Sequence, residues 1–192
     1  PYILYTARLE HPGKNHVRLL EAFAALKKTD HNPHHLILAG SPWFGAEAIY
    51  AAANDLGIAE YVIFAGFVPD EELPSLYAGA ELFAFPSLFE GFGIPLLEAM
   101  ASGTPLVASN VASIPEVVQD AGLLFEPTRT EEIRAAIARL IEDDELREKL
   151  VKLGLQQSQR FSWDDSAKQV WEICHAAVVS GKNLSEPCEN TK

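Results

Sequence analysis

Several residue types are scarce in this 192-residue chain, and their scarcity excludes whole classes of protein. Its two cysteines, Cys174 and Cys188, are too few for a disulfide framework and lack the spacing of metal ligands. Basic residues are also few, because 15 Lys and Arg stand against 27 Asp and Glu and leave a net charge of −12. A general nucleic-acid binder needs a cationic surface, so nucleic acid is not expected as a partner.

Long apolar runs are lacking as well. No uninterrupted run approaches the ~20 residues of a membrane span, and the N-terminus does not have the layout of a signal peptide. The remaining composition, 48% hydrophobic with 12 Gly and 12 Pro, is typical of a globular domain with one sizeable core. We therefore expect a soluble, acidic, cytoplasmic domain.

Short apolar runs alternate with segments of helical period along the chain. Strands are expected at residues 2–7, 35–40, 61–66, 81–86, 105–109 and 122–125. Helices are expected at residues 16–28, 46–56, 70–78, 95–102, 115–119, 130–141, 144–160 and 163–179. The pattern predicts an α/β fold, a Rossmann-like doubly wound parallel sheet of about six strands with helices on both faces and further helices at the C-terminus.

The same pattern sets the expected boundaries. Residues 1–180 are expected to form one Rossmann-like domain, with Asp70 capping the third helix and Ser162 capping the last one. Residues 181–192 are polar and without a pattern, which predicts a frayed, disordered tail.

Charged residues and glycines follow the expected strands at their carboxyl ends. Open parallel sheets bind ligands beyond these ends. Arg8 and Lys14 follow the first strand, and Gly91 and Gly93 follow the fourth. Glycine lets backbone approach a ligand without a Cβ in the way, and the helix expected from Pro95 directs free N–H groups toward an anion.

Two carboxylates belong to the same segment. Glu90 and Glu98 lie eight residues apart, and carboxylates accept hydrogen bonds from paired hydroxyls such as those of a ribose or a hexose. Together with the cations Arg8 and Lys14, they describe a ligand with an anionic middle and hydroxylated ends. A nucleoside diphosphate sugar has this chemistry.

From about Tyr2 to Val170, the chain resembles the C-terminal, donor-binding half of retaining glycosyltransferases of the GT-B fold, in particular glycosyltransferase family 4. The resemblance is carried by RLEHPGKNHVRLLEAF, AGFV, SLFEGFGIPLLEAMASGTPLVAS with its E-x7-E pattern, and IPEVV followed by DAGLLFEP. It implies catalytic roles for Arg8, Lys14 and Glu90, the two cations holding the departing diphosphate and the carboxylate contacting the transferred sugar. It also implies that no metal ion or other cofactor is used.

The resemblance further implies a set of donor-binding residues. Glu98 would receive the ribose hydroxyls, and backbone after the third strand would contact the base. The residues expected to bind the donor are Phe67, Val68, Gly91, Phe92, Gly93, Ile94 and Glu98.

The resemblance covers one of the two Rossmann-like domains of such enzymes. An N-terminal acceptor domain of the same polypeptide is therefore the expected partner, any peripheral membrane association would come from that half, and this chain alone should transfer a hexosyl unit poorly or not at all. A stand-alone nucleotide-sugar binding module and a GT-B nucleotide-sugar 2-epimerase stay open as alternatives. UDP-, GDP- and ADP-linked donors are equally compatible with the motifs.

Three of the four charged residues also have a purely structural interpretation. Glu98 could serve only to stabilise the dipole of its helix, Lys14 could be a solvated residue before a helix, and Arg8 could pair with an acidic neighbour.

Overall fold

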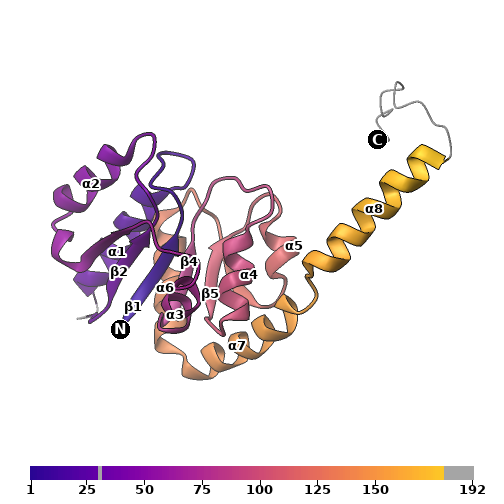
Figure 1. Cartoon of the computed structure of the whole chain (residues 1–192). Helices are drawn as coiled ribbons and strands as arrows, with labels where there is room; N and C mark the ends of the chain where they lie inside the picture. The colour runs from indigo at the N-terminus through magenta and orange to yellow at the C-terminus, as the bar shows by residue number, and fades with distance from the viewer. Residues whose placement is uncertain (30–31, 180–192) are drawn as a thin grey trace. The chain divides into compact units, whose positions relative to one another are not determined.

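The computed structural model describes residues 1–29 and 32–179 and contains a six-stranded sheet in which every strand pair is parallel (Figure 1). The strands are β1 (Tyr2–Thr6), β2 (His35–Ala39), β3 (Val62–Gly66), β4 (Leu82–Phe85), β5 (Leu106–Ser109) and β6 (Gly122–Phe125). Their spatial order, β3-β2-β1-β4-β5-β6, is that of a doubly wound Rossmann-like sheet. The predicted fold class is confirmed.

Helices cover both faces of this sheet. They are α1 (His16–Thr29), α2 (Ala46–Asp55), α3 (Leu73–Ala78), α4 (Ile94–Ala101), α5 (Ile114–Val118), α6 (Thr130–Glu142) and α7 (Asp144–Ser158), with a short 3-10 helix, η1 (Ala59–Tyr61), before β3. One layer is formed by α1 with its neighbours α2 and α6, and the other by α4 with α3, α5 and α7 (Figure 1).

The core lies along the central strands. All described side chains of β4 and β5 are buried, as are those of β1 from Ile3 onward. Ile3 is paired with Leu82, and Phe83 with Leu106, so the apolar runs meet in register across the middle of the sheet. Strands buried on both faces need continuous apolar sequence, which is why these segments could be recognised as strands.

The third helix begins later than expected. Asp70 does not cap it, because the helix starts at Leu73 and no side-chain bond caps its first turn. The N–H groups of Glu72 and Leu73 both bond to the carbonyl of Pro69, so a turn precedes the helix. Pro74 explains the delay, since proline lacks an N–H and fits only the first turn of a helix.

The chain divides into two compact units, Pro1–Ser158 and a second one from Gln159 onward. The expected domain of residues 1–180 thus extends beyond the first unit, and the inclusion of the last helix in it stays a prediction. The tail expected over residues 181–192 lies outside the described residues.

The second unit contains α8 (Trp163–Val179). Ser162 caps it as expected, because its Oγ accepts a hydrogen bond from the N–H of Asp165 at 3.2 Å. Among the residues described in either unit, no helix has both the length and the apolar character that a membrane crossing requires.

Candidate functional site

A cavity of about 290 Å³ opens at the carboxyl ends of β1 and β4. These two strands are neighbours, but the chain leaves them toward opposite edges of the sheet, to β2 and to β5. Such a switch point is where doubly wound sheets hold their ligands. The cavity is lined by Thr6, Ala7, Lys14, Phe85, Glu90, Phe92, Gly93, Ile94 and Pro95.

Lys14 and Glu90 meet at this cavity. Lys14 Nζ lies 2.7 Å from Glu90 Oε1, and the two side chains keep 23% and 13% of their surface exposed. The pair joins the loop after β1 to the loop after β4, 76 residues further along the chain. The structure therefore brings together a cation and a carboxylate that the sequence placed at one edge, although their roles stay predictions.

A buried tyrosine holds the backbone of Lys14 in place. Tyr5 donates a hydrogen bond from its hydroxyl to the carbonyl of Lys14 at 2.8 Å, and its oxygen lies 3.1 Å from Ser87 Oγ. The N–H of Leu88 donates to the carbonyl of Gly13 at 3.0 Å. These bonds tie the loop after β1 directly to the loop after β4.

Asn15, which follows Lys14, joins three loops. Its Nδ2 donates to the carbonyls of Pro86 at 2.9 Å and Pro127 at 2.8 Å, which follow β4 and β6. Its Oδ1 accepts from Arg18 Nη1 at 2.7 Å. The residue is buried and has a φ of 58°, a left-handed conformation that asparagine tolerates better than most residues.

A second network holds Glu98. Tyr77, at the end of α3, donates its hydroxyl hydrogen to Glu98 Oε2 at 2.8 Å, and the hydroxyl oxygen of Tyr77 lies 2.7 Å from Thr6 Oγ1. Thr6 is the last residue of β1 and lines the cavity, so the network connects Glu98 to it. Burial raises the pKa of Tyr77, which keeps the phenol protonated as a donor.

The two glycines of the loop after β4 differ in whether a larger residue would fit at their position. Gly93 has a φ of 94°, and a Cβ there would lie 2.8 Å from Leu96 Cδ1, so the start of α4 needs glycine at this position. A Cβ at Gly91 would meet nothing within 4 Å. Gly91 is exposed, and its backbone is open to a ligand.

Ser113, in the loop after β5, fixes the carbonyls of this glycine loop. Its Oγ lies 3.2 Å from the carbonyl oxygen of Glu90 and 3.3 Å from that of Phe92. The backbone that carries Glu90 is therefore tied to β5 as well as to β1.

Arg8 follows β1 but does not line the cavity. Its side chain is 57% exposed, and its Nη2 lies 3.3 Å from Glu10 Oε2. The Cζ of Arg8 lies 5.1 Å from the centre of the Trp43 ring. The acidic-neighbour interpretation thus fits the structure, and a role for Arg8 at the diphosphate stays a prediction.

Phe67 and Val68 follow β3, at the edge of the sheet. The order of the strands places β2 between β3 and β1, and neither residue lines the cavity. Phe67 is 72% exposed, whereas Val68 packs partly against the core. Their contact with a base stays a prediction.

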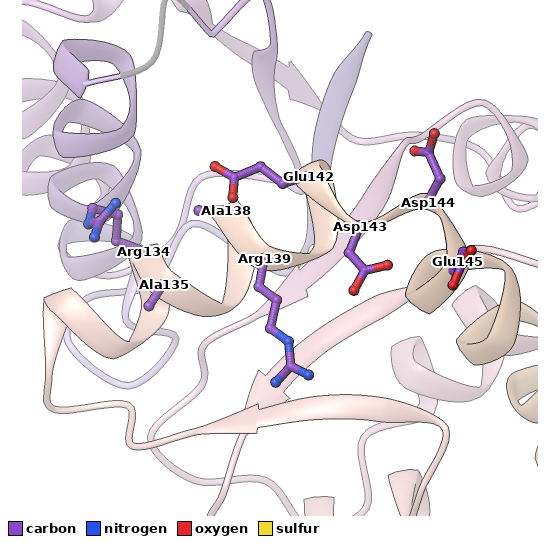
Figure 2. A pocket seen from close by; sticks show the side chains of 8 residues that line it. All are labelled: Arg134, Ala135, Ala138, Arg139, Glu142, Asp143, Asp144 and Glu145. Carbon is purple, nitrogen blue, oxygen red and sulfur yellow. The ribbon is translucent and has the colours of Figure 1, made fainter.

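A larger hollow of about 750 Å³ lies where α6 ends and α7 begins. Figure 2 shows that its acidic side chains, from Glu142 to Glu145, point in different directions and do not converge. Since α6 starts after the carboxyl end of β6, its far end belongs to the opposite edge of the sheet. Volume alone therefore does not identify the site.

The structure adds four residues that the sequence analysis did not single out: Thr6, Asn15, Tyr77 and Ser113. Two of them left a signal, because Thr6 is the polar end of a buried apolar strand and Asn15 directly precedes a helix. Tyr77 and Ser113 reach the site only through the tertiary fold, and nothing in their local sequence marks them.

Comparison with known proteins shows which family the chain resembles. The family model for glycosyl transferases group 1 matches residues 1–157. The chain is 40% identical over 168 residues to O-antigen chain mannosyltransferase B of Escherichia coli, across 88% of this chain and 44% of that protein. It is 32% identical over 175 residues to D-inositol 3-phosphate glycosyltransferase of Corynebacterium urealyticum, across 88% and 41%. The chain spans less than half the length of these curated relatives.

Solved structures show the same fold. Sucrose-phosphate synthase from Thermosynechococcus elongatus superposes with a TM-score of 0.82 at 27% identity, over 94% of this chain and 46% of that one. Anabaena HepE in complex with UDP-glucose superposes with a TM-score of 0.81 at 28% identity, over 91% and 48%. Because the family model matches most of its residues and the fold agrees throughout, this chain belongs to the glycosyl transferases group 1 family.

Proposed function

We propose that this chain binds a nucleoside diphosphate sugar and forms the donor-binding half of a retaining GT-B glycosyltransferase. The enzyme would move a hexosyl unit from the donor to an acceptor hydroxyl. The observation that carries the proposal is the Lys14–Glu90 pair at the mouth of the switch-point cavity. The names of the relatives support a hexosyl transfer, and the UDP-glucose complex of HepE supports the donor class.

Lys14 supplies the first part of the chemistry. When the bond between the sugar and the diphosphate breaks, negative charge develops on the departing diphosphate, and a nearby ammonium stabilises it. The N-terminal end of α1 begins two residues after Lys14 and adds the positive end of its dipole. Exposed Arg8 would swing from Glu10 to the same diphosphate.

The gain in rate from these cations follows from ordinary magnitudes. A hydrogen bond to a charged group contributes about 1.5–3 kcal/mol. If each of Arg8 and Lys14 gained ~2 kcal/mol more on the leaving group than in the ground state, the pair would supply roughly 10³ in rate. In this mechanism, side chains stabilise the negative charge of the departing diphosphate, so no metal ion or other cofactor is required.

Glu90 would act on the sugar. Its carboxylate is paired with Lys14, and a diphosphate would compete with it for the ammonium. Once displaced, its carboxylate is free to accept hydrogen bonds from hydroxyls of the transferred sugar, beside the exposed backbone of Gly91.

Calorimetry of the 192-residue chain with UDP, GDP and ADP tests donor binding. We expect at least one nucleotide to bind, and Lys14→Ala to weaken that binding about tenfold, which corresponds to ~1.4 kcal/mol. Lys28→Ala is the matched control, because Lys28 is an exposed lysine on the neighbouring helix α1 and should leave affinity unchanged. Absence of heat with all three nucleotides at millimolar concentration would refute the proposal.

The remaining parts of the proposal concern the larger protein. We expect the acceptor to bind an N-terminal half of the same polypeptide, the anomeric configuration to be retained, and the enzyme to act in the cytoplasm. A transfer assay on a polypeptide that contains both halves, with NMR of the product's anomeric proton, tests the first two expectations. A product of inverted configuration would contradict the assignment to the retaining class.

A further inference from the structure

We propose that Tyr77, assisted by Thr6, is a positioning residue that orients Glu98 to receive the ribose hydroxyls of the bound nucleotide. The inference rests on the proposed function, because it concerns the same donor site. The observation behind it is the chain of two hydrogen bonds from Thr6, through Tyr77, to Glu98.

The chemistry of the three groups fixes the direction of both bonds. An ionised carboxylate can only accept hydrogen bonds, so the hydroxyl hydrogen of Tyr77 is directed to Glu98 Oε2. A phenol has one hydrogen, so the short contact to Thr6 must be donated by the threonine hydroxyl. Thr6, at the end of β1, is therefore joined to Glu98, on α4, by two hydrogen bonds that both run toward the carboxylate.

Tyr77 is itself held rigidly. Its side chain is 1% exposed and packs edge-on against Phe83, with ring centroids 5.3 Å apart. Its backbone carbonyl accepts a hydrogen bond from Thr104 Oγ1 at 2.8 Å. A donor fixed in this way can restrict the rotation of the partly buried Glu98, which on a helix surface would otherwise sample several rotamers.

The bond also leaves Glu98 able to bind a diol. Within the described part of the chain, Tyr77 is the hydrogen-bond partner of the Glu98 carboxylate, and it occupies one position on Oε2. Oε1 and the second lone pair of Oε2 then remain able to accept further hydrogen bonds. Two acceptors of fixed geometry suit the adjacent hydroxyls of a ribose, whereas a freely rotating carboxylate would lose entropy on binding them.

Titrating two proteins with two nucleotides distinguishes a role of Tyr77 in orienting Glu98 from a role in supporting the fold. The 192-residue chain and its Tyr77→Phe variant are titrated with whichever of UDP, GDP and ADP binds best, and with the 2′,3′-dideoxy form of that nucleotide. We expect the intact chain to prefer the hydroxylated nucleotide about tenfold, a difference of ~1.4 kcal/mol. Tyr77→Phe should reduce this preference to less than about twofold and leave affinity for the dideoxy form unchanged.

Tyr2→Phe is the matched control. The hydroxyl of Tyr2 donates to the carbonyl of Leu76 on the same short helix, at 2.7 Å, so its loss removes a bond of the same kind without touching Glu98. The preference for the hydroxylated nucleotide should survive in this variant. Thr6→Val keeps the shape of the side chain and should lower the preference in the same direction as Tyr77→Phe.

Each other outcome overturns the inference. Equal weakening of both ligands by Tyr77→Phe would mean that Tyr77 supports only the fold. An unchanged preference would mean that Glu98 is oriented without it. A chain that binds the nucleotide without preferring its hydroxyls would refute the inference and leave donor binding intact, whereas a chain that binds none of the three nucleotides would refute both.

Discussion

Replacing Asn15 by glycine and by alanine separates the two contributions of this residue to the site. Glycine keeps the left-handed backbone available but removes the side-chain amide, while alanine removes the amide and also strains the backbone. We expect both variants to be destabilised, and the alanine variant more than the glycine variant.

The magnitude follows from the bonds that are lost. The amide of Asn15 satisfies the carbonyls of Pro86 and Pro127, which both belong to buried residues. A buried acceptor without a partner costs about 1–3 kcal/mol, so Asn15→Gly should lower the free energy of unfolding by about 3 kcal/mol. Asn15→Ala should lower it by about 1 kcal/mol more, because an L-residue in the left-handed region costs roughly 1–2 kcal/mol.

Thermal unfolding followed by far-UV circular dichroism measures this effect. For a chain of this size, 1 kcal/mol shifts the melting temperature by about 2–4 °C, so Asn15→Gly should lower it by about 6–12 °C. Asn54→Ala is the control, because Asn54 makes a comparable bond to the carbonyl of Tyr50 on the exposed surface of α2. That change should stay within about 0.5 kcal/mol of the unchanged chain.

Two results would refute the reasoning. If Asn15→Gly melted within about 2 °C of the unchanged chain, the three loops would not depend on the amide. If Asn15→Ala were as stable as Asn15→Gly, the left-handed backbone would not require asparagine or glycine.

Three further predictions concern other parts of the first unit. Burial lowers the pKa of His16 from 6.5 to about 4, so between these pH values the unfolded chain takes up a proton that the folded chain does not. The free energy of unfolding should therefore fall by up to about 3 kcal/mol as the pH drops from 6.5 to 4. Chemical denaturation across that range should show this slope, and His16→Phe should flatten it. Gly40→Ala should prevent folding as judged by circular dichroism, since its Cβ would lie 2.0 Å from the backbone oxygen of Ala7; a folded variant with a normal melting temperature would contradict the close approach. Glu90→Gln should bind pyrophosphate about three- to tenfold more tightly by calorimetry, because Lys14 loses its competing carboxylate; weaker binding would mean that the pair does not compete with the ligand.

Most of the fold could be predicted because each strand can be recognised from its own short stretch of sequence. β4 and β5 are short apolar runs bounded by turn residues, and a strand buried on both faces needs such a run. Apart from the start of α3, the helix boundaries agree with the expected ones to within two residues. Ser162 caps α8 as its sequence position predicted. The start of α3 was wrong because its acidic residues suggested a first turn that Pro74 excludes.

The site could be predicted where neighbouring strands determine it. Lys14 and Glu90 follow β1 and β4, which are adjacent in the sheet, so their meeting required only the topology. The pairing of Arg8 with an acidic neighbour was one interpretation of the sequence. Its position over Trp43 could not be predicted, because Trp43 comes from the loop after β2, whose path the sequence does not specify. The same holds for Tyr77, which reaches Glu98 from a helix on the face of the sheet.

The stacking of Arg8 on Trp43 gives the molecule an optical reporter of its own state. The emission of an indole should change when a guanidinium leaves its ring, and this indole lies beside the arginine that is expected to move. Trp163 and Trp171 belong to the second unit, and replacing both by phenylalanine would leave Trp43 as the single tryptophan of the chain. The emission of Trp43 should therefore follow the departure of Arg8 in real time, without a label and at protein concentrations far below those of calorimetry.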